Sequence, residues 1–363
     1  MTVEAGPMKL KLELDLDYKP RLPKNVDRPI GIVGAGWIVE KCHLPAYRAA
    51  GYNVAAIASR TPAHARALAK RFAIPHVYDD YRDLLAQPTI DIVDIAFPPE
   101  RQLEVVQAAT EQGKHILCQK PLAWTYSDAS QIVRLAQEAG VKLGVNMNMR
   151  YDPAIRSTQR LLRQGFLGQP VLATIDLRVR NVPQEFARGY RNVFMNLSIH
   201  HLDCFRFWFG DPARITVSQT GYPGQAFVGE AISLYVLEYA DGRRCAAWDD
   251  GFTWTDDYGI RYRVEGTEGV AKGTIGWPDF APSTLALYSR RVGDAWVNVR
   301  FKERWFFEAF IGTMAQLMVA IEEDAEPELN GPDHLQTIRL ALAGYRSADE
   351  GRPASPLEIG PQR

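Results

Sequence analysis

The chain has 363 residues, of which 46% are hydrophobic and 23% are charged, and its formal net charge is -1. This composition is that of an ordinary globular protein long enough for two domains, and the balanced charge argues against a nucleic-acid partner. No apolar run approaches the roughly 20 residues that a membrane-spanning helix needs, and the N-terminus lacks the apolar core of a signal peptide, so no membrane partner is expected.

The four cysteines stand far apart and form no Cys-x-x-Cys pair, which is typical of reduced, mostly buried thiols in a cytoplasmic protein. They are Cys42, Cys118, Cys204 and Cys245. The one close histidine pair, His200-His201, occupies adjacent positions, whose side chains do not face one ligand point on a helix. The sequence therefore predicts no metal site.

Residues 1–28 are interpreted as an N-terminal arm. Residues 9–18 alternate between apolar and charged side chains with the period of a strand, and Pro20 and Pro23 then break the pattern. The arm is either an edge strand or an ordered segment of its own subunit, or an extension that crosses to a neighbouring subunit.

Residues 29–150 alternate between short apolar runs and amphipathic segments. Strands are expected at 30–33, 54–58, 90–96, 115–118 and 141–145, and helices at 38–50, 100–112 and 125–139, with another that starts at Pro62 after Thr61 as its N-cap. Such alternation predicts a dinucleotide-binding α/β domain, in which helices cover both faces of a doubly wound parallel sheet.

The first strand and the first helix are joined by a Gly-Ala-Gly turn at residues 34–36. The two glycines let the backbone approach a ligand closely, and the N–H groups at the helix start, near Trp37 and Ile38, can point at a pyrophosphate. The sequence therefore predicts a dinucleotide-binding turn. The third small residue of this fingerprint falls at Val39, which is larger than Gly or Ala, so the helix is expected slightly further from the strand.

The second strand ends at Ser59 and Arg60, about 20 residues after the glycines, where an acidic residue would bind the ribose hydroxyls of NAD. This chain has no acid there. Ser59 and Arg60 could bind the 2′-phosphate of NADP instead, or Arg60 could be a solvated residue that stacks on adenine. The choice between NAD and NADP stays open.

The pattern changes after Arg150. Residues 151–363 are expected to form an α+β domain with a large, mostly antiparallel sheet. Strands are expected at 171–180, 215–220, 231–239, 243–249, 258–265 and 270–275, and helices at 152–164, 196–209, 305–322 and 332–349. Asp241-Gly242 is a hairpin signal. The last two helices are expected to pack back towards the first domain.

Lys120 follows the expected strand 115–118 and precedes Pro121. Its place at the end of a strand is the carboxyl edge of the sheet, where ligands bind in such folds. An exposed surface lysine is the alternative, but a strand-end lysine next to a proline is held in place. We therefore expect a functional role for Lys120.

A second polar cluster lies in the expected helix 196–209. Asn196 and His200 are four residues apart and share one face, and Asp203 lies near that face. A histidine can carry protons near neutral pH, and a polar neighbour fixes its tautomer. A packed or solvated histidine is the alternative.

Together, these features resemble the glucose-fructose oxidoreductase, inositol dehydrogenase and rhizopine-catabolism (Gfo/Idh/MocA) family of oxidoreductases, from about Ile30 to Pro353. The stretches that carry the resemblance are residues 31–38, 119–121, 148–153, 200–203 and 345–348. The resemblance implies a nicotinamide-dependent enzyme that acts on sugars, cyclitols or their derivatives. It also implies a homodimer or homotetramer formed through the C-terminal sheet.

The resemblance assigns residues as well. It implies three catalytic residues, which are Lys120, His200 and Asn196. The residues expected to bind the cofactor are Gly34, Gly36, Trp37, Ile38, Ser59, Arg60, Phe97, Pro98, Gln119 and Lys120. The residues expected to bind the substrate are Lys120, Arg150, Asn196, His200, His201 and Asp203.

Two acids of the family pattern are amides in this chain. Gln119 replaces the Glu before Lys-Pro, and Asn196 replaces the catalytic Asp, whereas Lys120 and His200 match. Without these carboxylates, His200 lacks a partner for its protonated form. Lys120 loses nearby anions too, so its pKa could fall through repulsion or desolvation, which would suit Lys120 to act as a base.

The leading hypothesis is an NAD(P)-dependent sugar or cyclitol dehydrogenase or ketoreductase in which Lys120 and His200 handle the proton. One alternative is an NAD-dependent glycoside hydrolase that oxidises the sugar transiently and eliminates the aglycone. Another is a non-catalytic nucleotide-binding sensor, which the residues at 39, 119 and 196 favour and the retained Lys120 and His200 disfavour.

Overall fold

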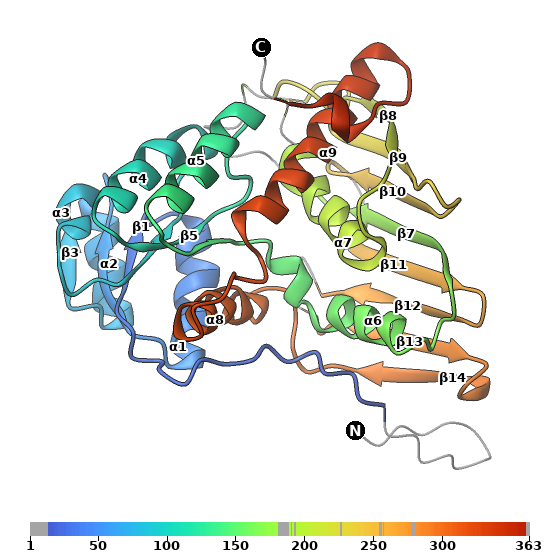
Figure 1. Cartoon of the computed structure of the whole chain (residues 1–363), viewed down its shortest axis with the longest axis horizontal. Helices are drawn as coiled ribbons and strands as arrows, with labels where there is room; N and C mark the ends of the chain where they lie inside the picture. Colours follow the sequence, from blue (N-terminus) through green and yellow to red (C-terminus); the bar gives the residue numbers. More distant parts are fainter. Residues whose placement is uncertain are drawn as a thin grey trace. The chain divides into compact units, whose positions relative to one another are not determined.

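The computed structural model describes residues 14–180, 189, 191, 194–225, 227–253, 256, 258–276 and 281–360 (Figure 1). The chain divides into two compact units. The six-stranded unit comprises Pro20–Asn148, Phe307–Leu335 and Gly360–Arg363, and the eight-stranded unit comprises Met1–Lys19, Met149–Phe306 and Gln336–Ile359. No helix in the described ranges is long and apolar enough to span a membrane.

The sheet of the six-stranded unit is parallel throughout, in the order β3-β2-β1-β4-β5-β6. Its strands are β1 (Ile30–Val33), β2 (Val54–Ala58), β3 (His76–Tyr78), β4 (Ile92–Ile95), β5 (His115–Cys118) and β6 (Leu143–Val145). Every residue of β1 and β4 is buried, as expected for the central strands of a sheet covered on both faces. The strand order reverses between β1 and β4. Ligands bind such sheets at this switch point, outside the carboxyl ends of the strands.

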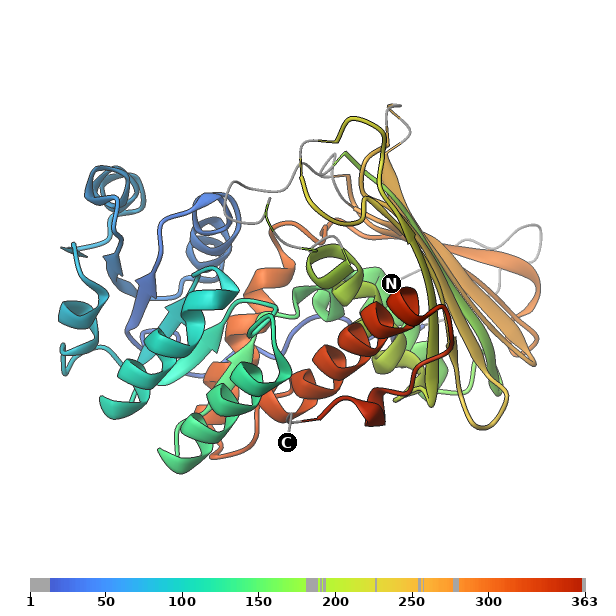
Figure 2. The same cartoon turned by 90° about the horizontal axis from the view of Figure 1, so that it is seen from above.

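Helices cover both faces of this sheet (Figure 2). One face carries α4 (Pro99–Glu111) and α5 (Tyr126–Glu138), and the other carries α1 (Leu44–Ala50) and α8 (Ala309–Glu322), which pack together. The shorter helices α2 (Pro62–Phe72) and α3 (Tyr81–Leu85) flank β3 in the chain. Because α8 contacts both α1 and β6, a segment from late in the chain completes this unit.

The sheet of the eight-stranded unit has the order β14-β13-β12-β11-β7-β10-β9-β8. Its strands are β7 (Pro170–Arg178), β8 (Arg214–Thr220), β9 (Ile232–Glu238), β10 (Arg244–Asp250), β11 (Gly259–Gly266), β12 (Gly269–Ile275), β13 (Thr284–Ser289) and β14 (Gly293–Arg300). The pair β7 and β10 is parallel, and the other neighbours are antiparallel. Helices α6 (Pro153–Arg163) and α7 (Ile199–Phe209) pack on one face of this sheet.

Alternation along the strands separates the two faces of this second sheet. On β9, Tyr235 and Leu237 are buried, whereas Leu234 and Val236, which alternate with them, are exposed. Trp248 of β10 lies opposite Leu234 and is 58% exposed. The face turned away from α6 and α7 therefore presents a group of apolar side chains to solvent.

The doubly wound parallel sheet and the mostly antiparallel second sheet are confirmed. The sequence analysis missed β3, α3, β13 and β14, and the helix expected at 305–322 begins only at Ala309. The long helix α9 (Gly331–Glu350) agrees with expectation. Thr61 precedes α2 as expected, but its side chain caps nothing, and the Ser59 hydroxyl accepts a hydrogen bond from the Thr61 amide instead.

The strand expected near the N-terminus is wrong for its described part, residues 14–18, which are irregular, and residues 9–13 lie outside the described ranges. The alternation instead reflects one-sided burial. Leu14 and Leu16 are buried, whereas Asp15 between them accepts a hydrogen bond from Arg160 Nη2 at 3.0 Å. These residues therefore pack within their own chain.

Candidate active site

The turn after β1 needs its two glycines for different reasons. Gly34 has a φ of 120°, and a Cβ there would lie 2.6 Å from the carbonyl oxygen of Ala96. Backbone conformation and space both exclude a side chain at this position. A Cβ on Gly36 would meet no atom within 4 Å, so the turn faces open space at that point. A pyrophosphate over a helix N-terminus requires such an open approach.

The helix after this turn begins at Trp37 and Ile38, and a π-helical segment, Val39–His43, leads into α1. The first N–H groups of a helix have no carbonyl partner within it, so they are suited to an anionic ligand. Val39 is fully buried. The larger residue at the third position of the fingerprint is thus accommodated in the core.

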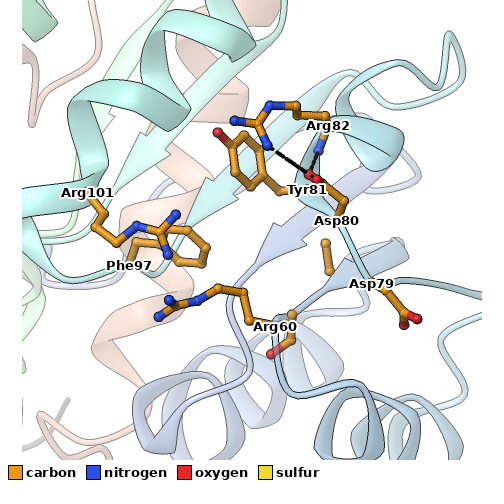
Figure 3. Close-up of a pocket in the computed structure, with 9 residues that line it drawn as sticks. Arg60, Asp79, Asp80, Tyr81, Arg82, Phe97 and Arg101 are labelled. Atoms are coloured by element: carbon orange, nitrogen blue, oxygen red, sulfur yellow. Dashed lines mark hydrogen bonds and ion pairs between the residues drawn. The ribbon is translucent and has the colours of Figure 1, made fainter.

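A pocket of about 100 Å³ lies at the end of β2 (Figure 3). It brings together Ser59, Arg60 and Phe97, three of the residues expected to bind the cofactor, and Pro98 follows as the residue before α4. The remaining lining residues are Ala58, Asp79, Asp80, Tyr81, Arg82 and Arg101. None of these six was anticipated from the sequence.

Two of the three arginines in this pocket are held by aromatic rings. The Arg82 guanidinium lies 4.7 Å from the centre of the Tyr81 ring and binds Asp80, and the Arg101 guanidinium lies 5.1 Å from the centre of the Phe97 ring. Arg60 enters no ion pair or hydrogen bond with any residue in the described ranges, and Figure 3 shows it reaching towards Phe97. The pocket therefore offers an anion a guanidinium that is not engaged elsewhere.

Lys120 lies two residues after the carboxyl end of β5 at Cys118, next to the buried Gln119. Desolvation lowers the pKa of Lys120 to about 7. The expected fall in pKa therefore has burial as its cause. An amine in this range is neutral in a large fraction of molecules at physiological pH, so it can accept a proton as well as donate one.

Gln119 contacts a buried network that the sequence analysis did not anticipate. Its Nε2 lies 2.7 Å from His43 Nε2, and the other ring nitrogen of His43 lies 2.5 Å from Asp94 Oδ2. Tyr47 donates its hydroxyl proton to the same carboxylate oxygen at 2.8 Å. His43, Tyr47 and Asp94 are fully buried. The network therefore links the start of α1, strand β4 and the end of β5.

In the eight-stranded unit, Asn196 lies in a π-helical segment, Phe194–Ser198, that leads directly into α7. His200 is the second residue of α7 and is buried, with its ring edge-on to Trp305 at 5.1 Å between ring centres. Asn196 is partly exposed. Lys120 belongs to the six-stranded unit.

Arg150, His201 and Asp203 stay predicted substrate residues, and the structure shows that each has a buried partner within the eight-stranded unit. Arg150 donates two hydrogen bonds to the Asp203 carboxylate, both at 2.6 Å. His201 Nδ1 lies 2.8 Å from Asp249 on β10. His201 and Asp203 are each about 1% exposed. The local spacing identified polar residues correctly, but it contained no information on these partners.

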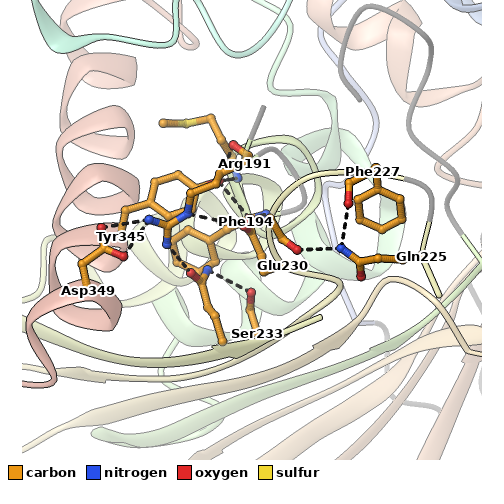
Figure 4. A network of polar contacts seen from close by, with 11 residues as sticks. Arg191, Phe194, Gln225, Phe227, Glu230, Ser233, Tyr345 and Asp349 are labelled. Atoms are coloured by element: carbon orange, nitrogen blue, oxygen red, sulfur yellow. Dashed lines mark hydrogen bonds and ion pairs between the residues drawn. The ribbon is translucent and has the colours of Figure 1, made fainter. Parts of the chain in front are cut away.

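The start of the helix that carries Asn196 and His200 is fixed by a buried carboxylate (Figure 4). Glu230 Oε1 accepts hydrogen bonds from the Phe194 amide at 2.8 Å and from the Tyr345 hydroxyl at 2.9 Å. That hydroxyl also lies 2.8 Å from the carbonyl oxygen of Arg191, and the Met195 amide donates to it at 3.3 Å. Burial, and then the charge of Glu230, raise the pKa of Tyr345, so the phenol keeps its proton.

A Gly-x-Gly turn at the switch point of a parallel sheet, followed by a helix start, defines a dinucleotide-binding α/β fold. Residues 28–147 match the oxidoreductase family with an NAD-binding Rossmann fold, and residues 159–357 match the C-terminal alpha/beta domain of that family. The chain therefore belongs to the Gfo/Idh/MocA oxidoreductases. The expected nicotinamide dinucleotide is confirmed as the cofactor class.

Curated relatives and solved structures agree with this assignment. The chain is 28% identical to D-apiose dehydrogenase from Paraburkholderia graminis over 88% of each chain. It is 26% identical to inositol 2-dehydrogenase from Rhizobium meliloti, over 90% of this chain and 98% of the relative. An Agrobacterium radiobacter oxidoreductase, solved with NAD+, L-tartaric acid and magnesium, has the same fold, with a TM-score of 0.81 at 23% identity over 92% of this chain and 100% of that one.

The two glycines of the turn give a matched pair of variants. Gly34→Ala is expected to reduce the free energy of unfolding by about 1–3 kcal/mol, because it forces a side chain into a positive-φ conformation against Ala96. Gly36→Ala should leave the Tm unchanged and weaken dinucleotide binding, because its methyl group enters the open space. Thermal unfolding and a fluorescence titration with NADPH measure these effects. A stable Gly36→Ala variant with full affinity would contradict the assigned binding turn.

Proposed function

We propose that the protein is an NAD(P)-dependent dehydrogenase or ketoreductase that acts on a hydroxyl-bearing carbon of a sugar, a cyclitol or a derivative of one. Family membership and the activities named for the two relatives support this class of reaction. The observation that carries the proposal is Lys120, a strand-end amine with a pKa of about 7. Such an amine can exchange a proton with a substrate hydroxyl near neutral pH.

The residues at the switch point fit a nicotinamide dinucleotide. The open space over Gly36 and the adjoining helix start suit its pyrophosphate, and the arginine-lined pocket suits its adenosine end. Trp37, Ile38, Phe97, Pro98 and Gln119 would complete the binding surface. When bound, this cofactor supplies the hydride acceptor or donor, while the protein supplies orientation and proton handling.

In the proposed reaction, Lys120 takes the hydroxyl proton when the substrate is oxidised and returns a proton when the carbonyl is reduced. His200 is the proposed second proton-handling group, and Asn196 supplies a neutral hydrogen-bonding group near it. The support for His200 lies within its own unit, where the Glu230 carboxylate fixes the start of the helix and Trp305 packs against the imidazole.

Arg150, His201 and Asp203 have a positioning role in this proposal. Their polar atoms are buried and bound to partners within the eight-stranded unit. Asp203 also accepts a hydrogen bond from the Thr337 hydroxyl of α9 at 3.0 Å. The three residues therefore tie α7 to its surroundings and leave substrate contact to Asn196 and His200.

We propose NADP as the preferred cofactor. The pocket at the end of β2 contains three guanidinium groups, and Arg60 is not engaged by any described residue. Its two carboxylates have partners, because Asp80 binds Arg82 and Asp79 lies 3.6 Å from Arg66. A dianionic 2′-phosphate suits this charge distribution better than a pair of ribose hydroxyls.

The open face of the eight-stranded sheet is the proposed contact surface of a homodimer or homotetramer. Leu234, Val236 and Trp248 are neighbours on β9 and β10, and all are exposed. An apolar group of this kind on a sheet is typical of a surface that binds another protein.

Lys120→Ala is expected to lower kcat by roughly 100- to 10,000-fold, because the proton acceptor is lost, while the affinity for the dinucleotide changes little. The measurement is nicotinamide absorbance with NAD and NADP in turn, against a panel of pentoses, hexoses, uronates and inositols. Lys70→Ala removes an exposed lysine from α2 and should match the parent protein. Undiminished turnover without Lys120 would refute its role.

The pH profile tests the same amine. In the oxidation direction, the rate should rise as the pH increases through about 7, because Lys120 must be neutral to accept a proton. In the reduction direction, the rate should fall over the same range, because Lys120 must be protonated.

The same assays separate the dehydrogenase from the alternative activity. If no substrate gives a net change in absorbance and nucleotide is released on denaturation, the result would favour the glycoside hydrolase that oxidises its substrate transiently. Absence of nucleotide binding would refute both.

Arg60→Ala is expected to raise the KM for NADP by roughly 10- to 100-fold, because a charge-assisted contact to the phosphate is lost, with little effect on the KM for NAD. Arg134→Ala, which removes an exposed arginine from α5 outside the pocket, is the matched control. Equal weakening of both cofactors by Arg60→Ala would assign Arg60 to stacking on adenine.

Trp248→Lys is expected to dissociate the oligomer, because it places a charge in the centre of the apolar group. Light scattering after size-exclusion chromatography measures the mass. Leu357→Lys changes another exposed apolar residue, 86% accessible and outside both sheets, and should leave the mass unchanged. A parent protein that is monomeric at all concentrations would exclude the proposed contact.

A further inference from the structure

The chain leaves the parallel sheet just before Lys120. The Gln119 amide still donates to the carbonyl oxygen of Ile95 on β4, at 3.0 Å. Lys120 and the three residues after it, here called the lysine segment (residues 120–123), lie beyond β5, yet residues 121–123 are buried. Because buried backbone groups need hydrogen-bond partners, the lysine segment requires partners from outside the sheet.

Gln102 of α4 binds two carbonyl groups of the lysine segment. Its Nε2 donates to the Pro121 carbonyl oxygen at 2.7 Å and lies 3.3 Å from the Leu122 carbonyl oxygen. The amide nitrogen carries two protons, one for each carbonyl, whereas a carboxylate of the same shape has none to donate. Gln102 is fully buried. It therefore fixes the orientation of two successive carbonyl groups directly after Lys120.

The amide of Leu122 has a partner from a late part of the chain. It donates to His334 Nε2 at 3.4 Å, near the start of α9. A backbone N–H can only donate, so this ring nitrogen presents a lone pair. His334 is 2% exposed and belongs to the six-stranded unit, like the lysine segment. Two buried side chains, 19 and 212 residues away from their partners, thus bind the lysine segment.

We propose that Gln102 and His334 are positioning residues that hold the backbone after Lys120, so that its amine keeps one place at the carboxyl edge of the sheet. The inference deepens the proposed dehydrogenase function and rests on it. The lysine stem is flexible, so the place of its amine depends on how firmly the backbone is held. The sheet holds that backbone before Lys120, through Gln119, and the two side chains hold it afterwards. Proton transfer needs hydrogen-bond reach, and a displacement of about 1 Å can cost about 100-fold in rate.

Gln102→Met tests the amide, because methionine has a similar length and no N–H donor. We expect kcat to fall roughly 10- to 100-fold, with little change in the KM for the dinucleotide. A looser segment also admits water to the Lys120 amine, whose pKa desolvation lowers to about 7, so the midpoint of the pH profile for oxidation should rise. Gln107→Met, at an exposed position of the same helix, is the matched control.

The pH midpoint separates positioning from stability. A general loss of stability lowers the amount of active enzyme without moving the midpoint. A parental kcat in Gln102→Met, or a lower kcat with an unmoved midpoint, would overturn the role of Gln102. The Tm of each variant shows whether the protein is folded in the assay.

His334 allows a test by rescue. His334→Leu removes the acceptor for the Leu122 amide, whereas His334→Gln offers a carbonyl oxygen in its place. We expect His334→Leu to lower kcat and raise the pH midpoint, and His334→Gln to stay close to the parent protein. His76→Leu, at an exposed position of β3, is the matched control. Equal impairment of the Leu and Gln variants would overturn the role of the acceptor.

Hydrogen exchange of the Leu122 amide provides a test that does not depend on turnover. Mass spectrometry with electron-transfer fragmentation measures this exchange at single residues. We expect slow exchange in the parent protein and in His334→Gln, and faster exchange in His334→Leu. Fast exchange in the parent protein would overturn the proposal even in a fully active enzyme. The expected exchange in a protein without dehydrogenase activity would retain the held segment and reject only the proposed function.

Discussion

The parallel pairing of β1 with both β2 and β4 is the constraint on which the rest of the six-stranded unit depends. With the other parallel pairs, this pairing places the carboxyl ends of all six strands along one edge of the sheet. The segments that follow the strands then lie on either side of β1 along that edge. The glycine turn after β1, the arginine pocket after β2 and the lysine after β5 therefore occur along the same edge of one sheet. Gly34 has a positive φ that favours glycine, and position 36 faces open space. Both features make this edge accessible to a ligand.

In both units, a buried aspartate on a strand binds a histidine at the start of a helix and so holds the helix against the strand. In one, a histidine at the beginning of α1 binds Asp94 of β4, and a tyrosine hydroxyl donates to the same carboxylate. In the other, His201 of α7 binds Asp249 of β10, which also receives the Tyr235 hydroxyl at 3.0 Å. A buried carboxylate that binds a histidine and a tyrosine in this way specifies one arrangement of helix and strand, because removal of either partner leaves a buried charge with fewer hydrogen bonds.

The sequence was sufficient for features that are encoded locally. Continuous apolar runs identified the central parallel strands, alternation identified most of the antiparallel ones, and the glycine turn and the lysine before Pro121 marked the ligand edge. The three residues of β3 and the five of α3 are too short to display a period. Arg82, which follows β3, was missed for that reason.

Long-range partners could not be read from spacing. His43 contacts Asp94 and Gln119, which are 51 and 76 residues away in the chain, and no local pattern links them. The same limitation applies to His201 and Asp203, whose partners Asp249 and Arg150 are 48 and 53 residues away in the chain.

The order of the segments has a consequence for the synthesis of the protein. The six-stranded unit includes residues up to Leu335, and its helix α8 packs against α1 and β6, which are made much earlier. A ribosome must therefore deliver nearly the whole polypeptide before this unit can close its core. Domains that are contiguous in sequence can fold one after the other as they emerge. Here the first strands are synthesised long before α8, one of the last helices, completes their unit. A product truncated before α8 would leave the apolar surface of α1 exposed to chaperones and proteases.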